Sequence, residues 1–185
     1  MRKIGWGMAI LMVLGLAGTA AAQQGVPTVI EVVDLSRYMG RWFAIASIPT
    51  TFERQCVEGT TADYRLLENG KVEVVNTCFD ARGRESRVVG RAWVPDAGAP
   101  GRLKVSFVGF LGLWLFAADY WIVDLDPGYR YAVVGHPTRE FGWILSRTPT
   151  LPAGTLDCIF FRLEDQGYRR EQFVRIDQSI HGSAP

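Results

Sequence analysis

Eight short segments with β-strand alternation follow one another between residues 42 and 147, and this succession constrains the fold most. Most of the links between them are too short for a crossover helix, which favours antiparallel neighbours. Turn signals such as Asn69-Gly70 and Asp126-Pro127-Gly128 separate the segments. We therefore predict an all-β, eight-stranded antiparallel up-and-down barrel with strands at 42–48, 60–67, 71–79, 86–94, 102–108, 120–125, 129–135 and 141–147.

One long helical pattern follows the eighth strand. Apolar residues recur there at three- and four-residue steps, namely Leu156, Ile159, Phe160 and Leu163. This spacing predicts an α-helix over 152–166 whose apolar face packs on the outside of the barrel. We also expect one helical turn at 34–39, capped by Asp34 or Ser36, and a short final strand at 173–176.

The first 22 residues have the pattern of a secretory signal peptide. Arg2 and Lys3 precede an apolar run at 10–17, and Ala20-Ala21-Ala22 offers a small-residue cleavage site. A membrane anchor is the alternative, but the apolar run is short for one. The remaining chain then consists of a leader at 23–33, one domain at 34–178 and a tail at 179–185.

Charge and cysteine content limit the classes of partner. Loss of the signal peptide would remove Arg2 and Lys3 from 20 basic residues and leave 19 acidic ones, for a net charge near −1. Without a basic stripe, nucleic acid is not an expected partner. Three cysteines in an oxidising compartment predict one disulfide and one free thiol.

Strand alternation divides the barrel into a filled end and a hollow end. It directs Trp42 inward together with Ala44, Ala46 and Ile48, so that the large ring fills the floor and leaves the far end free for a pocket. The expected ligand-binding residues are Ala44, Ala62, Tyr64, Val74, Asn76, Val88, Val105, Phe107, Tyr120, Ile122, Val134, His136 and Trp143. The same alternation turns Val72, Ala132, Phe141 and Leu145 inward. This mainly apolar lining with a few polar groups suits an acyl chain whose polar end stays near water.

The link at 108–118, between the fifth and sixth strands, is unusually apolar and falls at the open end. It contains Phe110, Leu111, Leu113, Trp114 and Leu115. Two interpretations remain open. The link folds over the cavity mouth, or it forms a hydrophobic lip that contacts membrane lipid or a second copy of the chain.

Four ordered segments resemble the lipocalin family. They are Gly40-Arg41-Trp42-Phe43-Ala44-Ile45-Ala46, the hairpin of Thr61–Leu66 with Asn69–Val72, Tyr131–Gly135, and Trp143–Pro149. The last is similar to a segment of the bacterial outer-membrane, apolipoprotein-D-like branch, and the whole resemblance runs from about 33 to 178. It implies a structural signature of Gly40, Trp42 and Arg147, in which the guanidinium covers the indole.

The resemblance also implies a function. We expect an exported protein that binds a fatty acid or lysophospholipid for lipid storage or transport in the cell envelope. Many bacterial members are anchored lipoproteins, but no cysteine follows the apolar run here. A periplasmic protein without a lipid anchor is therefore expected, with its association with the outer membrane left open. The alternatives are a barrel enzyme acting on a hydrophobic substrate and a protein-interaction scaffold that uses 108–118.

The expected disulfide is Cys56–Cys78. Cys56 falls in the first link between strands and Cys78 at the end of the third strand, and both lie at the open end of an up-and-down barrel. A related family pattern keeps Cys56–Cys158 as the rival, and otherwise Cys158 is expected to be part-buried on the helix. Nothing places His136 or His181 beside Cys158, so we expect no enzyme activity, no cofactor and no metal site.

Overall fold

A computed structural model describes residues 25–182 of the chain. The expected signal peptide lies outside these residues, as do the first two residues of the leader and the end of the tail. The strands are β1 Gly40–Ser47, β2 Glu58–Leu66, β3 Val72–Phe79, β4 Glu85–Trp93, β5 Arg102–Ser106, β6 Val108–Phe110, β7 Leu113–Leu115, β8 Ala118–Leu125, β9 Tyr131–Gly135, β10 Gly142–Ser146 and β11 Val174–Arg175. The α-helices are α1 Leu35–Tyr38 and α2 Ala153–Asp165, and the 3-10 turns are η1 Thr51–Glu53, η2 Arg170–Gln172 and η3 Ser179–His181.

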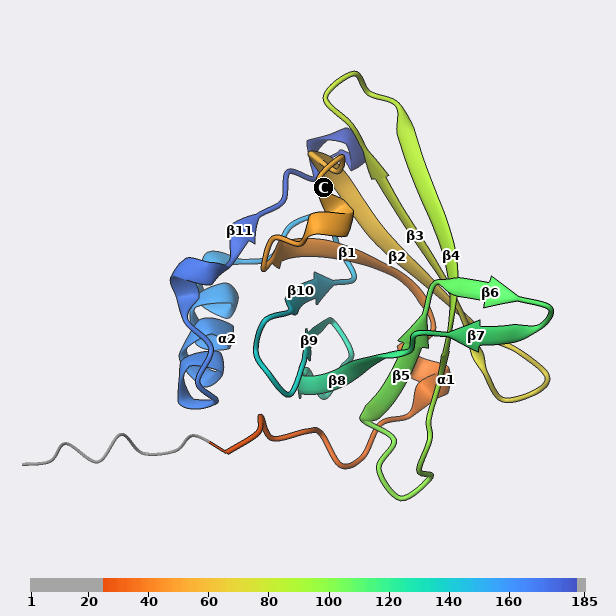
Figure 1. Ribbon diagram of the computed structural model, residues 1–185. Coiled ribbons are helices and arrows are strands. Elements are labelled where there is room, and N and C mark those ends of the chain that lie inside the picture. Colours follow the sequence, from red (N-terminus) through yellow and green to blue (C-terminus); the bar gives the residue numbers. More distant parts are fainter. Residues whose placement is uncertain (1–24, 183–185) are drawn as a thin grey trace, which may run out of the picture.

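Eight of these strands form a closed antiparallel barrel (Figure 1). The order runs from β1 through β5 to β8, β9 and β10, and β10 pairs back onto β1 to close the sheet. The predicted up-and-down barrel is therefore confirmed. The predicted final strand is also present as β11, which pairs with the end of β1 beyond the reach of β2.

One bulge changes which side of β1 faces inward. The register against β10 shifts between Ala44 and Ala46. Trp42 and Ala44 point into the barrel, but Ile45, Ala46 and Ile48 all belong to the core cluster beneath α2. The expectation that Ala46 and Ile48 face inward is wrong, because an extra residue in a strand reverses the alternation that follows it.

Helix α2 packs on the outside of the barrel, as its apolar face predicts. Its four stripe residues are buried against side chains from the outer face of the sheet, namely Ile45, Val123, Val133 and Ile144. Figure 1 shows α2 beside β9 and β10, on the side away from the β6–β7 hairpin. Burial of four large apolar side chains ties this wall of the barrel to the helix.

The expected helical turn is α1, and Asp34 rather than Ser36 caps it. Asp34 Oδ1 accepts hydrogen bonds from the backbone N–H groups of Ser36, at 2.9 Å, and Arg37, at 3.3 Å. The backbone N–H of Asp34 donates to Tyr129 Oη at 2.8 Å, which links the cap to the turn between β8 and β9. These contacts hold α1 across the end of the barrel at which β1 begins.

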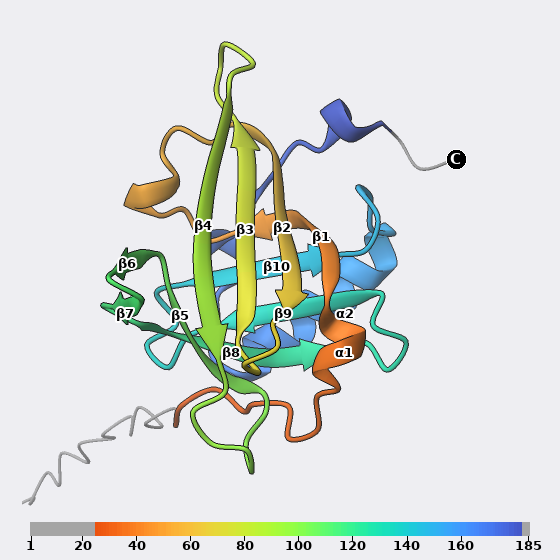
Figure 2. The ribbon, with the colours of Figure 1, turned by 90° about the vertical axis from the view of Figure 1, so that its right-hand side faces the viewer.

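Figure 2 shows that the β3–β4 hairpin extends well beyond the remaining strands at one end of the barrel. Its turn is held by Asp80, whose carboxylate accepts from the backbone N–H groups of Arg82 and Arg84 at 2.8 and 3.0 Å.

Within residues 25–182, no helix is both long enough and apolar enough to cross a membrane.

Candidate ligand-binding site

The closed end of the barrel is built around Trp42. Its ring is fully buried, and its Nε1 donates to the Tyr38 carbonyl oxygen at 2.8 Å. The Arg147 guanidinium lies 3.7 Å from the centre of the ring and donates to the carbonyl oxygens of Arg37, at 2.7 Å, and Arg41, at 2.9 Å. Burial lowers the pKa of Arg147, but these acceptors and the indole face offset the lost hydration.

Gly40 supplies the backbone conformation with which β1 begins beside this stack. Its φ is +91°, in the region that favours glycine, and a Cβ there would lie 3.4 Å from Arg147 Nη1. Gly40, Trp42 and Arg147 thus form one structural unit that seals the floor. The structure places all three where the sequence interpretation expects them.

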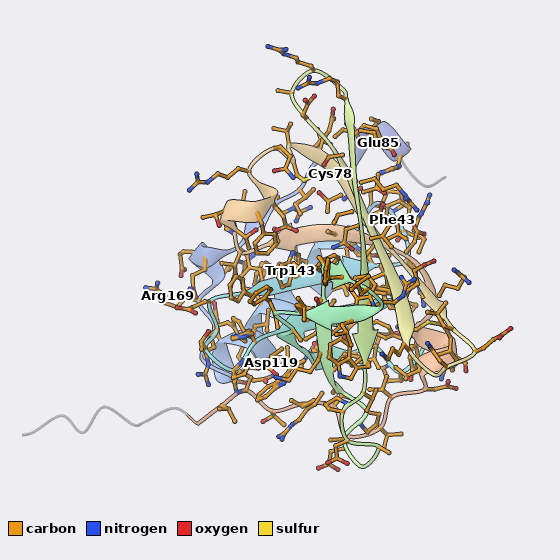
Figure 3. All side chains as sticks on the ribbon, turned by 45° about the vertical axis from the view of Figure 1, so that its right-hand side comes forward. Phe43, Cys78, Glu85, Asp119, Trp143 and Arg169 are labelled. Atoms are coloured by element: carbon orange, nitrogen blue, oxygen red, sulfur yellow. A yellow bond between two sulfur atoms is a disulfide. The ribbon has the colours of Figure 1, made fainter. Side chains whose placement is uncertain are left out.

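Above the floor lies a cavity of about 510 Å³ that opens at the opposite end. It is lined by twelve of the thirteen side chains predicted to bind ligand: Ala44, Ala62, Tyr64, Val74, Asn76, Val88, Val105, Phe107, Tyr120, Val134, His136 and Trp143. Phe141 and Leu145, also expected to face inward, complete this part of the lining. Trp143 and Asp119, labelled in Figure 3, come from β10 and β8, and Cys78 comes from β3.

Ile122 is the exception. Its side chain has the inward orientation expected from its strand, but it is fully buried in the core cluster with Trp42 and does not reach the cavity. Strand alternation predicts which face of the sheet a side chain lies on, but it does not predict how far along the barrel axis that side chain lies. The expectation that Ile122 lines the pocket is therefore corrected.

Several lining residues were missed because they lie in links or near strand ends, or, for Thr61 and Thr77, because alternation assigned them to the opposite face from Ala62 and Asn76. They include Phe52, Glu53, Gln55, Thr60, Thr61, Thr77, Ser86, Val108, Phe116, Ala118 and Asp119. The period of two carries no information about a 3-10 turn, and η1 brings Phe52 and Glu53 to the mouth. In the sequence, only the nearby Cys56, which is expected to form a disulfide at the open end, indicated that this link lies at the mouth.

Three tyrosines form a polar chain inside the barrel. Tyr120 Oη lies 2.9 Å from Tyr38 Oη and 2.9 Å from Tyr64 Oη. Burial raises the pKa of Tyr64 to about 12 and that of Tyr120 well above its usual value, so both are neutral hydroxyls at physiological pH. Near them, Asn76 Oδ1 is buried without a hydrogen-bond partner. The cavity therefore offers uncharged polar groups to a ligand.

The acidic groups of the cavity lie in different surroundings. Asp119 pairs with Lys104 at 2.8 Å. Burial raises the pKa of Glu53, while side-chain hydrogen bonds from Thr50, at 2.9 Å, and Trp143 act in the opposite direction. Within the described part of the chain, no Lys or Arg side chain lines the cavity.

The disulfide joins Cys56 to Cys78, with the two Cα atoms 5.4 Å apart. This confirms the favoured pairing and rejects Cys56–Cys158. Both half-cystines line the cavity, so the bond fastens the η1 segment to β3 at the mouth. Cys158 is exposed on α2 rather than part-buried, because it lies off the apolar stripe that packs on the sheet.

The apolar link at 108–118 is more ordered than a loop. It contains the two-stranded hairpin β6–β7, with Leu111 and Gly112 at its tip. Val108 and Phe116 at its base line the cavity, whereas the side chains toward the tip project into solvent. The hairpin does not fold as a whole over the mouth, and Figure 1 shows it standing away from the barrel wall.

The histidine and cysteine side chains singled out in the sequence lie apart from one another in the described structure. Among residues 25–182, no group of three or more His, Cys, Asp or Glu side chains is arranged to hold a metal ion. His136 lies at the mouth, with its Nδ1 2.9 Å from Thr138 Oγ1. Cys158 lies outside the cavity lining.

Comparison with known proteins assigns the fold to a family. Residues 33–178 match the model of the lipocalin-like domain. This chain belongs to the lipocalin family. The lipocalin interpretation of Gly40, Trp42 and Arg147 thus rests on both the geometry of the floor and the family match.

Curated relatives place this lipocalin in the branch expected from its sequence. The outer membrane lipoprotein Blc of Escherichia coli (strain K12) is 34% identical over 152 residues, which cover 82% of each chain. Apolipoprotein D of Mus musculus is 34% identical over 161 residues, which cover 83% of this lipocalin and 81% of that protein. Among solved structures, insecticyanin from the tobacco hornworm Manduca sexta has a TM-score of 0.65 at 24% identity. It covers 83% of this chain and 84% of that one, and this likeness shows the fold alone.

Proposed function

We propose that this lipocalin is an exported carrier that holds the acyl chain of a fatty acid or lysophospholipid in its barrel, for lipid storage or transport in the cell envelope. The observation that carries the proposal is the cavity of about 510 Å³, which is mainly apolar, sealed at one end by Trp42 and open at the other. Each buried methylene contributes about 0.8 kcal/mol, so a chain that enters this space binds without a charged anchor at the floor.

The disulfide supports the exported location in this proposal. The disulfide between Cys56 and Cys78 is typical of proteins outside the cytosol. The relative from Escherichia coli is named an outer membrane lipoprotein. We propose that this lipocalin works in the periplasm, where lipids must cross water between two membranes.

The carrier role accounts for the cavity better than catalysis does. The exposed Cys158 lies outside the lining, and the buried tyrosines are kept neutral by their raised pKa values. The tyrosine hydroxyls can donate hydrogen bonds to an ester or hydroxyl group of the ligand, but as neutral hydroxyls they are poor nucleophiles.

Native mass spectrometry of the protein purified from its own periplasm, followed by organic extraction, tests the carrier proposal. We expect a bound mass that releases a fatty acid or a lysophospholipid. A protein without bound lipid, which also shows no change in Trp143 fluorescence during titration with these lipids, would contradict the carrier proposal.

Filling the cavity should abolish binding. Val88 faces the cavity, and its side chain is 45% exposed, so Val88→Trp should place a large ring in the space with little strain. We expect at least a tenfold loss of affinity for a fluorescent fatty-acid analogue, because a tryptophan displaces several methylenes. Val57→Trp is the matched control, since Val57 is 55% exposed and outside the lining. Equal affinities of the two variants would place the ligand elsewhere.

We also propose that the β6–β7 hairpin inserts into lipid surfaces. Phe110 and Leu113 are each 64% exposed, and Leu111 and Phe116 are each 86% exposed. Leu111 has a φ of +48° and Phe116 one of +54°, a conformation that bulky residues adopt at a cost. A Leu-Gly tip where Asn-Gly is preferred indicates that an apolar tip has a use beyond folding.

The base of the hairpin is fixed, which suits an inserting arm. The buried Ser106 hydroxyl donates to the Leu115 carbonyl oxygen and accepts from the Val108 N–H at 3.2 Å. Trp114 turns back, with the Arg91 guanidinium 5.2 Å from its ring centre. A stable dimer needs about 20–30 residues on each side, far more than this hairpin offers, whereas lipid can surround its tip.

Leu111→Asn separates folding from lipid contact. We expect stability to rise by about 1 kcal/mol, because Asn adopts this backbone conformation more readily than Leu, while vesicle affinity falls about tenfold. Vesicle co-sedimentation and urea denaturation measure the two effects. Val32→Ser removes an apolar side chain that is 83% exposed in the leader and should leave vesicle affinity unchanged. If Leu111→Asn binds vesicles as tightly as the wild type, membrane insertion is contradicted. If the wild type sediments as a dimer and Leu111→Asn as a monomer, the hairpin contacts a second copy of the chain instead of lipid.

A further inference from the structure

The cavity mouth brings three aromatic rings and one carboxylate together. Phe52 and Glu53 come from η1, Phe141 lies just before β10, and Trp143 lies within it. Phe141 and Trp143 are stacked, with ring centres 6.3 Å apart. The Phe52 ring centre also lies 6.3 Å from that of Phe141, and the His136 ring packs edge-on against Phe141 at 5.2 Å. Glu53 adjoins Phe52 in η1 and lines the same cavity as Phe141 and Trp143, so the carboxylate lies at the edge of this aromatic cluster.

The Trp143 face differs from the other tryptophan faces of the described chain. A protein guanidinium or ammonium lies over Trp42, Trp93, Trp114 and Trp121, at 3.7 to 5.9 Å from the ring centre. Within residues 25–182, Trp143 has no such partner, and neither do Phe52 and Phe141. No protein guanidinium or ammonium therefore competes with a ligand cation for these three rings.

Glu53 also has no counter-ion within the described part of the chain. Its carboxylate accepts a hydrogen bond from the neutral hydroxyl of Thr50 at 2.9 Å. The adjacent Arg54 is exposed and does not line the cavity. A half-buried carboxylate without a paired cation is poorly hydrated, and a cationic ligand group at this point would restore its lost interactions.

We infer that Phe52, Glu53, Phe141 and Trp143 form a subsite for the ammonium head of a single-chain lipid, such as a choline or ethanolamine group. This inference rests on the proposed carrier function and concerns the ligand's head. Aromatic faces attract an alkylated ammonium, and the Glu53 carboxylate supplies the opposite charge. A free fatty-acid carboxylate at the same place would meet Glu53 with no Lys or Arg in the lining, so the site discriminates against it.

The test compares lipids that differ only in the head. Palmitoyl lysophosphatidylcholine, palmitoyl lysophosphatidylglycerol and monopalmitoylglycerol compete for a fluorescent probe in the cavity, each below its micelle concentration. We expect palmitoyl lysophosphatidylcholine to bind about tenfold more tightly than palmitoyl lysophosphatidylglycerol, a difference of about 1.4 kcal/mol. Glu53→Gln should reduce this ratio to about twofold, partly because loss of the negative charge strengthens binding of the anionic lysophosphatidylglycerol.

A matched variant controls for the rim's overall charge. Glu140 lies in the same rim, between β9 and β10, but outside the cavity lining, and it accepts a hydrogen bond from Thr138. Glu140→Gln therefore removes the same charge and should keep the tenfold preference. Trp143→Leu should lower affinity for the choline lipid more than for monopalmitoylglycerol, because it removes the cation-binding face and keeps an apolar side chain.

The outcomes separate the two proposals. If all three lipids bind equally well, or if Glu53→Gln leaves the tenfold ratio intact, the ammonium subsite is wrong while the carrier function stands. If none of the three binds, including the uncharged monopalmitoylglycerol, both the carrier function and the subsite are wrong. A preference lost equally in Glu53→Gln and Glu140→Gln would show a general charge effect and overturn the subsite.

Discussion

Trp42→Ala should lower the free energy of unfolding by about 3–5 kcal/mol, a large share of the about 5–15 kcal/mol typical of a domain. The ring is fully buried, and its removal leaves a cavity at the floor and takes away the face on which Arg147 stacks. The guanidinium would keep its carbonyl acceptors but lose its apolar cover. Urea denaturation at 25 °C, followed by circular dichroism, measures this loss.

Trp93→Ala is the matched control for Trp42→Ala. Trp93 is also a strand tryptophan with a cation over its ring, Lys71 at 5.9 Å, but it is only half-buried. It should cost about 1 kcal/mol or less. Trp42→Phe, which keeps a ring at the floor, should cost less than the alanine variant. Similar losses for Trp42→Ala and Trp93→Ala would refute a special role of the floor.

Removing the disulfide should cost about 3 kcal/mol. Cys56 and Cys78 are 22 residues apart, and cross-linking a loop of this length restricts the unfolded chain by about that amount. The double variant Cys56→Ser, Cys78→Ser should therefore melt about 6–12 °C lower than the wild type. Differential scanning calorimetry measures the shift.

Reductant and the third cysteine provide the controls for the disulfide variant. Cys158→Ser should leave the melting temperature unchanged, because this exposed thiol has no part in the bond. Dithiothreitol should lower the melting temperature of the wild type toward that of the double variant and leave the double variant unaffected. A wild type insensitive to reductant would contradict the stabilising role of the bond.

Local patterns decided much of the barrel. The links are too short for crossover helices, so neighbouring strands had to be antiparallel, and the Asn69-Gly70 turn placed the first hairpin. Alternate links of an up-and-down barrel lie at the same end of the barrel, so the sequence also placed Cys56 and Cys78 close together, as the structure confirms. The apolar stripe of α2 predicted its buried face residue by residue, because helix geometry repeats every 3.6 residues.

Alternation was less reliable where the sheet departs from a regular ladder. The bulge in β1 turned Ala46 and Ile48 toward α2, and the depth of Ile122 depends on how strands are staggered around the barrel. Both features arise from pairing between distant segments. A single strand's sequence has no local signal for either.

The sequence by itself determined the order and direction of the strands, the helix, the Trp42 floor and most of the cavity wall, because these follow from short-range periodicity and turn chemistry. Only the tertiary structure decided the mouth. Phe52 and Glu53 meet Trp143 from a 3-10 turn about 90 residues away in the chain, and the β6–β7 hairpin stands clear of the barrel. Such contacts depend on barrel closure and on the Cys56–Cys78 bond, which bring together segments whose own patterns carry no information about one another.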